Sequence, residues 1–415
     1  MKGSAGRVLM FLENAYPQDT RVRNEAELLT GLGYHVSVVC LRRSDQVTRE
    51  VVHGVQVYRI PTFEVFQKTP HTDSRVLHRI WVRLKSLVGY VGEYVYFTTA
   101  CLAMSVYVAA RRGFDVIHAH NPPDTLWLVA LPWKAFGKKF VFDHHDLCPE
   151  LYRSRYGAKY DALAKLLRLV EYGNLKLADI TIATNESYKE IALARGSRKP
   201  NTVFVVRNGP NVDRMRIPVP SVRLQNLGKK ILVYVGSLNP QDGVDYLLRS
   251  LKYLRYELNR GDFHCVIIGA GDSLHDLRSL AESLGLNGEV EFTGFISDEE
   301  LQESLAAADI CMDPDPASPL NNISTWIKVM EYMAYGKPIV SFDLKETRYS
   351  AQDAAIYVAP NDEVAFARAT ARLMDDRDLR ERMGQFGRAR VERELQWSVV
   401  GQNLGLAYAA LKLAH

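Results

Sequence analysis

Short runs of β-branched and other apolar residues recur along the chain and alternate with longer amphipathic stretches. In the N-terminal half, the stretch holding Val22, Ala26 and Leu29 has the three- to four-residue spacing that predicts a helix. Short strands that alternate with helices are typical of a parallel sheet covered on both faces. The strands predicted in this half are 7–12, 35–40, 115–118, 139–143, 179–183 and 202–206.

The pattern lapses between 209 and 229, where Asn, Pro and Gly are frequent, and a second series of strands and helices then begins. A chain of 415 residues is long enough for two domains. We expect a doubly wound domain over 1–208, a linker over 209–229 and a second doubly wound domain over 230–391, facing the first across a cleft. The final helix, within 392–415, is expected to return to the first domain. The strands predicted in the second domain are 231–235, 265–268, 289–292, 309–312 and 338–341.

The composition and the net charge argue against several classes of function. The formal net charge of +4 is too small and too dispersed to indicate a nucleic-acid partner. Five scattered cysteines without a CxxC pair argue against a disulfide framework and a structural zinc site. A reducing cytoplasm is the simplest setting, and the N-terminus runs into a strand without a recognisable signal peptide.

One apolar stretch, 86–110, has Glu93 as its single charged residue and is followed by Arg111 and Arg112. We interpret it first as a buried core helix. A helix resting on the membrane surface is the main alternative, with basic residues Arg75, Arg79, Arg83 and Lys85 nearby. A membrane-spanning helix is disfavoured, because the stretch lies between strands of one predicted domain.

Loops that follow strands carry the most functional weight, because ligands of such sheets bind at the carboxyl ends of the strands. The first loop, 13–23, opens a helix and offers Arg21 and Arg23 to an anion. The alternative is that these arginines pair with Glu25 or Glu27.

Two further loops in this half are rich in histidine. His118 and His120 come at the end of one predicted strand, and we expect them to lie on opposite faces, one in the core and one at a ligand. The segment 143–150 holds two histidines and three carboxylates, which suit a polar acceptor and proton transfer. A metal site built on these carboxylates is the competing interpretation of that segment.

A fourth candidate is a helix in the second half. Ser324 or Thr325 is predicted to cap it, and Gly336 to end it. Lys328 and Glu331 are three residues apart and share one face. A carboxylate there could accept hydrogen bonds from a ribose diol, and a lysine beside it could meet a phosphate. The alternative is a surface ion pair between the two.

This helix, KVMEYMAYGKPIV at 328–340, resembles the donor-site helix of family GT4 glycosyltransferases, which have the GT-B fold. The segments 234–250 and 267–314 and the motif VVRNGPNVDRM resemble other parts of the same family, in the same order. The resemblance covers nearly the whole chain. It implies a retaining enzyme with an acceptor-binding N-terminal domain and a donor-binding C-terminal domain.

The resemblance also implies roles for individual residues. Glu331 would hold the donor ribose, Gly236 lies at the diphosphate turn, and the backbone around Phe295 would contact the base. The catalytic residues implied are His120, Lys328 and Glu331. The donor-binding residues implied are Gly236, Ser237, Arg207, Gly269, Phe295, Ser324, Thr325, Lys328, Glu331 and Arg348. The acceptor-binding residues implied are Asp19, Arg21, Arg23, His144, His145 and Glu150.

Three positions depart from the family pattern. Ile323 stands where the first glutamate of the motif is expected, and Ser237 and Asp242 stand where an arginine and a lysine usually meet the diphosphate. We expect other cations to replace them, with Lys328, Arg348, Arg207 and Arg21 as candidates.

The segments DHHDLCPELY, SPLNNIST and DLKETRYSAQDA resemble a bacterial subgroup of the family linked to surface-polysaccharide assembly. The function that the resemblance implies is transfer of a sugar from a nucleoside diphosphate sugar, most simply a UDP-sugar, to a hydroxyl of a glycan or lipid-linked glycan in surface polysaccharide synthesis. We expect no metal or other cofactor, and a cytoplasmic location that includes the inner face of the membrane. The alternatives are a nucleotide-sugar epimerase on the same fold and a non-catalytic sugar-nucleotide-binding subunit. A nicotinamide dehydrogenase is disfavoured because no full GxGxxG motif follows a strand.

Overall fold

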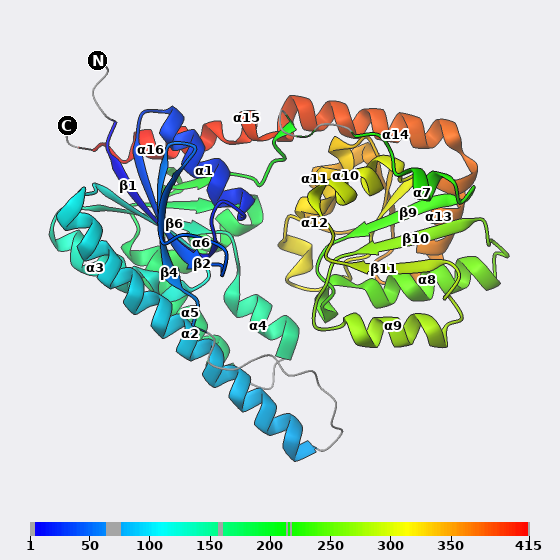
Figure 1. The fold of residues 1–415 in the computed structure, drawn as a ribbon, viewed down its shortest axis with the longest axis horizontal. Helices are drawn as coiled ribbons and strands as arrows, with labels where there is room; N and C mark the ends of the chain where they lie inside the picture. The colour runs from blue at the N-terminus through cyan, green and yellow to red at the C-terminus, as the bar shows by residue number, and fades with distance from the viewer. Residues whose placement is uncertain (1–4, 64–75, 157–160, 213–214, 216–217, 414–415) are drawn as a thin grey trace. The chain divides into compact units, whose positions relative to one another are not determined.

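The structure is a computed structural model that describes the chain except residues 1–4, 64–75, 157–160, 213–214, 216–217 and 414–415 (Figure 1). It divides into two compact units. The first comprises Met1–Arg207 with Gly401–His415, and the second comprises Asn208–Val400.

The N-terminal unit is built on an eight-stranded sheet in the order β3-β4-β2-β1-β5-β6-β7-β8, which is parallel except for the β3–β4 pair. Helix α1 packs against β2 and β4, whereas α2, α3, α5 and α6 pack one against the next in that order. The strands are β1 (Arg7–Ala15), β2 (His35–Arg42), β3 (Arg49–Val52), β4 (Val55–Pro61), β5 (Val116–His120), β6 (Lys139–His144), β7 (Ile180–Ala183) and β8 (Val203–Val205). The helices are α1 (Thr20–Gly31), α2 (Val76–Arg111), α3 (Trp127–Ala135), α4 (Cys148–Tyr156), α5 (Asp161–Leu177), α6 (Glu186–Gly196) and α16 (Gln402–Ala410).

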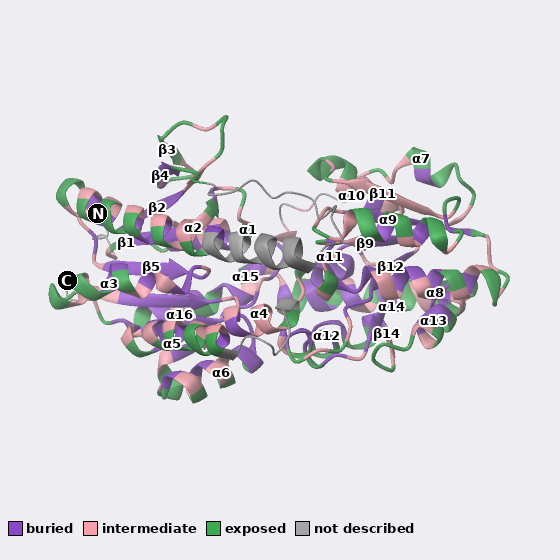
Figure 2. Ribbon diagram, turned by 90° about the horizontal axis from the view of Figure 1, so that it is seen from below, coloured by how far each residue is buried: buried purple, intermediate pink, exposed green. Residues whose placement is uncertain are grey.

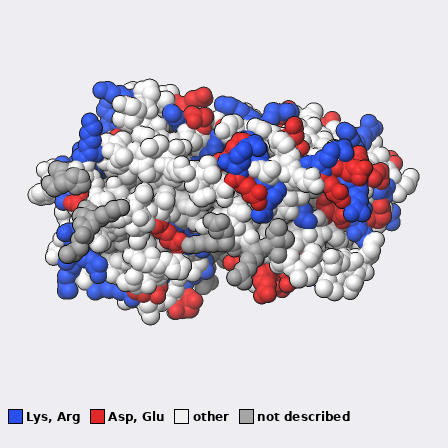
Figure 3. Space-filling view, turned by 90° about the horizontal axis from the view of Figure 1, so that it is seen from above, with Lys and Arg blue, Asp and Glu red and all other residues white. Residues whose placement is uncertain are grey.

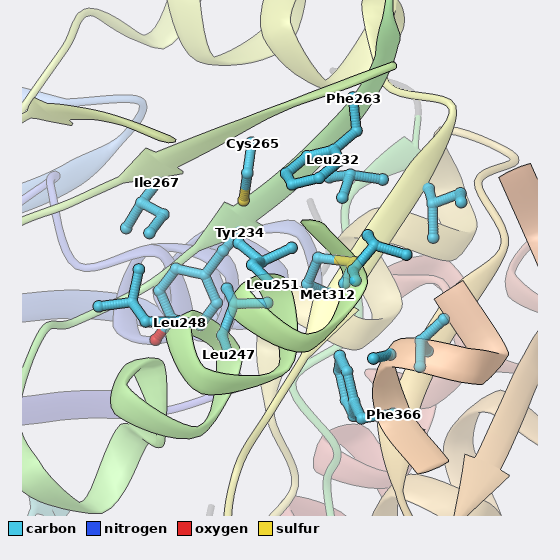
Figure 4. Packing of buried hydrophobic residues seen from close by; sticks show 14 of the residues in the cluster. Leu232, Tyr234, Leu247, Leu248, Leu251, Phe263, Cys265, Ile267, Met312 and Phe366 are labelled. Carbon is cyan, nitrogen blue, oxygen red and sulfur yellow. The ribbon is translucent and has the colours of Figure 1, made fainter. Parts of the chain in front are cut away.

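The C-terminal unit has a six-stranded parallel sheet in the order β11-β10-β9-β12-β13-β14. Leu247 and Leu251 of α8 and Phe366 of α13 pack with Leu232, Cys265 and other buried strand residues on one face of it (Figure 4). The strands are β9 (Lys230–Val235), β10 (Phe263–Ile268), β11 (Val290–Gly294), β12 (Ile310–Asp313), β13 (Ile339–Phe342) and β14 (Ala355–Val358). The helices are α7 (Val222–Gln225), α8 (Val244–Tyr256), α9 (Leu274–Ser283), α10 (Asp298–Ala307), α11 (Ile327–Ala334), α12 (Lys345–Ala351), α13 (Glu363–Asp375), α14 (Arg377–Arg390) and α15 (Trp397–Val400).

The predicted fold class is confirmed, because both sheets alternate with helices and are parallel apart from the β3–β4 pair. Two boundaries lie elsewhere than expected. The second unit begins at Asn208, so the predicted linker 209–229 lies within it, and Gly209 packs against the backbone of Leu395. The final helix is broken: Trp397 donates its backbone N–H to Pro210 O at 2.9 Å in the second unit, and the chain rejoins the first unit from Gly401.

Helix α2 contains the apolar stretch 86–110, and from Val91 onward it is buried on one face only. Phe97, Cys101 and Val108 are buried, whereas Val95 and Val106 are each 56% exposed (Figure 2). The interpretation as a core helix therefore holds for one face. Within the described residues, no helix has the length and apolar character needed to cross a bilayer. Arg75 lies outside the described residues, as do the side chains of Arg79, Arg83 and Lys85.

Glycines bring the ends of β9 and β10 into close approach. Gly269 has a φ of 135°, and a Cβ atom on it would lie 1.9 Å from the carbonyl oxygen of Gly236. We expect Gly269→Ala to lower the stability of the C-terminal unit by about 1–3 kcal/mol, measured by urea unfolding. Gly288→Ala is the control, because a Cβ there would meet no described atom within 4 Å. Equal effects of the two substitutions would contradict the prediction.

Candidate functional site

The N-terminal unit gathers charged side chains where β1, β5 and β6 end. Helix α1 begins there, capped by Asp19, whose carboxylate accepts a hydrogen bond from Val22 N at 3.0 Å. Arg21 and Glu25 follow in the first two turns, and both side chains are buried. The strand-end position is the one predicted for ligand binding in a doubly wound sheet.

The Arg21 guanidinium is bound by other residues of the protein. It donates two hydrogen bonds to the Asp143 carboxylate, at 2.7 and 2.6 Å, and one to Val206 O at 3.0 Å. It also pairs with Glu25 at 3.2 Å. The alternative interpretation of this loop, pairing with Glu25, is therefore what the structure shows, and the Arg21 charge is already neutralised. Arg23 is only partly buried, and its Nε has no hydrogen-bond partner in the described structure.

His118 and His120 lie on the same face of the sheet, so the expectation of opposite faces is wrong. Residues two apart in a strand face the same side, and the two rings stack with centroids 4.3 Å apart. Tyr408 OH of α16 lies 3.0 Å from His118 Nδ1, and Asp143 lies 2.9 Å from His120 Nδ1. Neither Nε2 atom has a hydrogen-bond partner among the described residues. Burial lowers the pKa of both histidines, which favours neutral rings.

Glu25 completes this cluster and was not identified from the sequence as a site residue. Its carboxylate is fully buried, and burial together with the nearby Asp143 charge raises its pKa to about 8. Ligand atoms of Glu25, His118, His120 and Asp143 lie within 4.8 Å of one another, a set that could hold a metal ion. Arg21 contacts both carboxylates and supplies the positive charge that such an ion would bring.

The histidine-rich segment 143–150 divides between two networks. His145 joins the first, with Nδ1 3.2 Å from Asp143. Burial opposes its charge, but the hydrogen bond and the charge of Asp143 outweigh burial and raise its pKa.

His144 and Glu150 lie in a separate network, although both were predicted to bind acceptor. His144 is fully buried, with Nε2 3.0 Å from Glu171. Arg195 donates to both Glu171, at 2.8 Å, and Glu150, at 2.5 Å. This arrangement ties α4, α5 and α6 together. His144 and His145 are neighbours at the end of β6 and point in opposite directions. His144 points into the interior, whereas His145 joins the network of Asp143.

In the C-terminal unit, glycines line the strand ends predicted to hold the donor. Gly236 follows β9 and Gly269 follows β10, and no side chain fits where their backbones meet. Ser237 beside them is exposed, and its carbonyl oxygen accepts a hydrogen bond from Tyr234 OH at 2.8 Å. Phe295, after β11, is 87% exposed. This arrangement suits a nucleotide, whose phosphates could lie against the backbone at the glycines and whose base could lie near the exposed Phe295 ring.

Helix α11 carries Lys328 and Glu331, but they do not pair with each other. Lys328 is buried and lies 3.4 Å from Asp313 and 2.5 Å from Asp315, both fully buried. Burial opposes its charge, but the charge of Asp315 outweighs burial and raises the pKa of Lys328. The turn Asp313-Pro314-Asp315 thus binds an ammonium group, a role that the sequence did not indicate.

Glu331 has a different environment. It is partly buried, and its carboxylate has no hydrogen-bond partner among the described residues. Burial, and to a smaller extent the charge of Asp298, raises the pKa of Glu331. The predicted caps do not act as such: Ser324 Oγ donates to Leu320 O at 2.9 Å, and Thr325 Oγ1 to Glu346 at 3.4 Å. Trp326 occupies the N-cap position instead, without a side-chain cap bond.

Two kinds of residue bear on the departures from the family pattern: the departing residues Asp242 and Ile323, and the replacement cations expected at Arg348 and Arg207. Asp242 accepts a hydrogen bond from Asn239 N at 2.9 Å within a capping box, so its carboxylate shapes the loop. Arg348 makes two 2.7 Å hydrogen bonds to Asp343 and lies over the Tyr357 ring. Arg207 is buried at the end of the first unit. Ile323 is partly buried before α11.

Known proteins resemble both units. Residues 18–209 match the family model "Glycosyl transferase 4-like domain" and residues 220–390 match "Glycosyl transferases group 1". The phosphatidyl-myo-inositol mannosyltransferase of Mycobacterium leprae is 30% identical over 205 residues, which are 49% of this chain and 52% of that protein. The chain spans 57%, 61% and 47% of the lengths of three further curated relatives.

Solved structures share the whole architecture. Sucrose-phosphate synthase from Thermosynechococcus elongatus has a TM-score of 0.71 at 19% identity, covering 98% of this chain and 99% of that one. Anabaena Alr3699/HepE, in complex with UDP and glucose, has a TM-score of 0.70 at 13% identity, covering 98% and 100%. At these identities the likeness shows the fold. With both family models matched in order, the chain belongs to the GT4-type glycosyltransferases of the GT-B fold.

Proposed function

We propose that this protein is a retaining glycosyltransferase that moves a sugar from a UDP-sugar to a hydroxyl of a glycan or lipid-linked glycan, in the synthesis of a surface polysaccharide. The observation that carries the proposal is Glu331. It is a partly buried carboxylate without a protein partner, on the helix that follows the Asp313–Asp315 turn in the donor-type unit. A carboxylate so placed can accept hydrogen bonds from both hydroxyls of a ribose.

The donor class is supported by two further features. Gly236 and Gly269 carry no side chain that would keep a diphosphate from the backbone of the loops that follow β9 and β10, and we propose N–H groups of those loops as its donors. The N–H groups of the two glycines themselves donate to Ile268 O at 3.0 Å and to Gly294 O at 3.1 Å. Alr3699/HepE, which has the same fold, is described in complex with UDP and glucose. Because Arg348 and Lys328 are ion-paired, we propose that the leaving diphosphate is met mainly by backbone N–H groups.

In the N-terminal unit, His120 is the proposed catalytic residue. If its Nδ1 holds the proton and donates to Asp143, Nε2 is left as an acceptor for a sugar hydroxyl. Asp19, Arg23 and His145 are proposed to contact the acceptor. Arg21 is proposed to act through Asp143, which it holds in place.

We propose that the reaction needs no metal. Two buried sets of acidic residues in the described part of the chain each hold a cation from the protein, Arg21 in the first unit and Lys328 in the second. A lipid-linked acceptor is supported by the named activity of the mycobacterial relative, whose acceptor is a phosphatidylinositol. Such an acceptor would bring the enzyme to the cytoplasmic face of a membrane.

The experiment that tests the donor site is a thermal-shift panel with UDP, GDP, ADP and TDP on Glu331→Ala and the wild type. UDP at about 100 times its dissociation constant is expected to stabilise the wild type by about 2.7 kcal/mol. The Glu331→Ala variant should lose most of that shift. Glu282→Ala, an exposed position on α9, is the control and should keep it.

If no diphosphate stabilises the wild type, the donor proposal fails. If UDP binds but no UDP is released from a UDP-sugar with any glycan or lipid-linked acceptor, a non-catalytic sugar-nucleotide-binding subunit is the better conclusion. That second candidate is favoured over an epimerase because Asp242 supplies a carboxylate where a lysine was expected, and because the Arg348 guanidinium is already bound by Asp343.

A further inference from the structure

Helix α2 exposes apolar side chains on the face that points away from the sheet. Val91, Val95, Leu102 and Val106 are between 40% and 56% exposed. Their spacing of four, seven and four residues places them on one side of the helix. The opposite side is buried, as Phe97, Cys101 and Val108 show. The outward side therefore forms a continuous apolar strip along this helix.

Helices α3 and α5 extend the strip sideways. Trp133 of α3 donates to Ser105 Oγ of α2 at 2.8 Å. Trp127 of α3 packs against Gly173 of α5, where a Cβ atom would lie 2.5 Å from the indole. The three helices thus lie side by side, with α3 in the middle (Figures 1 and 2).

The outward positions of these two helices are also apolar. On α3 and just beyond it, the exposed residues are Leu128 at 45%, Leu131 at 47% and Phe136 at 74%. On α5 they are Leu166 at 53%, Leu169 at 64% and Tyr172 at 40%. We call these outward residues of α2, α3 and α5 the apolar face. Exposed apolar side chains that gather over neighbouring helices mark an interaction surface, whereas singly scattered ones need no explanation.

The charges at the apolar face have one sign. Among the residues of the three helices whose exposure is described, the exposed charged side chains are Arg111, Lys165, Arg168 and Lys176. Arg168 lies 3.5 Å from Glu150 of α4. Glu93 is partly buried and Glu171 is buried. Another face of the molecule differs, since Figure 3 shows basic and acidic side chains intermingled there. On α14, for example, Arg377 pairs with Glu381 at 2.7 Å.

We propose that the apolar face docks on an anionic lipid bilayer, with α2, α3 and α5 lying in the plane of the headgroups. Apolar side chains would enter the acyl boundary, and the lysines and arginines would meet lipid phosphates. The uniform positive charge argues for an anionic leaflet as the occupant. The docking itself is argued from the apolar face alone. Only its biological purpose, access to a lipid-linked acceptor, rests on the proposed function.

The test is flotation of the full chain with vesicles of phosphatidylglycerol and phosphatidylcholine, compared with phosphatidylcholine alone. We expect binding to the anionic vesicles that weakens as salt is added. Val106→Asp/Leu169→Asp should reduce the bound-to-free ratio at least tenfold, because both residues leave the acyl boundary and acquire repelled charges. The matched control, Val51→Asp/Leu406→Asp, changes residues of the same unit that are 64% and 60% exposed elsewhere. It should stay within twofold of the wild type.

Three outcomes would overturn the proposal: no flotation of the wild type, equal flotation of both double variants, or a self-associated wild type that Val106→Asp/Leu169→Asp converts to a monomer with flotation unchanged. The last result would assign the face to a second copy of this chain. The UDP thermal shift is measured on the same variants. A shift that is retained while flotation is lost would show that docking fails independently of the donor site.

Discussion

Asp143→Asn is expected to lower the stability of the N-terminal unit by about 3–5 kcal/mol, the cost of removing one partner from a buried ion pair. The substitution leaves the Arg21 guanidinium, which is about 5% exposed, without its two-bond partner in the interior. It also removes the anion that His120 and His145 face. Calorimetry should show the transition of the N-terminal unit moving to lower temperature.

The control makes the same chemical change at the surface. Asp115 pairs with Lys138 at 3.5 Å, and the Asp115 side chain is 45% exposed. Asp115→Asn should cost at most about 1 kcal/mol, because exposed ion pairs contribute little. Arg21→Met combined with Asp143→Leu should cost less than the sum of the single substitutions, since neither charge is then left alone. An effect of Asp143→Asn no larger than that of Asp115→Asn would contradict this account.

Most of the fold could be predicted from the sequence, because central strands of a parallel sheet are apolar on both faces. β1, β2, β9 and β10 all have that pattern. The strands that were missed are at sheet edges or next to them. β3 is largely exposed and antiparallel to β4, and β14 is only four residues long and half-buried. The weak apolar patterns of β3 and β14 reflect the smaller burial of these edge positions. β4, which lies next to the edge and is mostly buried, was also missed.

The candidate site could be located from the sequence but not resolved into contacts. Strand-end position identified Arg21, His120 and Glu331. It did not indicate that Glu25 completes the first cluster, because a glutamate one turn after an arginine is usually a solvated pair. Nor did it separate His144 from His145, because their environments depend on Glu171 and Arg195, which come from helices later in the chain.

Lys328→Met is the second substitution with a large expected effect. It removes the ammonium group that lies 3.4 Å from the Asp313 carboxylate and 2.5 Å from the Asp315 carboxylate, and both carboxylates are fully buried. We expect the C-terminal unit to lose about 3–5 kcal/mol at pH 8, measured by urea unfolding. Lys252→Met, at an exposed position on α8, should stay within about 0.5 kcal/mol of the wild type.

The stability lost in Lys328→Met could come from an unpaired buried carboxylate or from the lost packing of the lysine side chain. The pH dependence of the free energy of unfolding distinguishes these two causes. Burial already raises the pKa of Asp315 with Lys328 present, and removing the lysine should raise it further. A carboxyl group with a raised pKa binds a proton more tightly in the folded state than in the unfolded state. The variant should therefore regain stability as the pH falls from 8 towards 5. A loss independent of pH would attribute the effect to packing of the lysine stem.

Asp315→Asn in the Lys328→Met background then separates structure from donor binding. Removing one of the two unpaired carboxylates should restore part of the lost stability, and it should flatten the pH dependence. The UDP thermal shift of this stabilised double variant is the deciding measurement. Its loss would support contact of Lys328 with the donor diphosphate. Its survival would restrict Lys328 to holding the Asp313–Asp315 turn, and would leave the diphosphate to backbone N–H groups of the loops that follow β9 and β10.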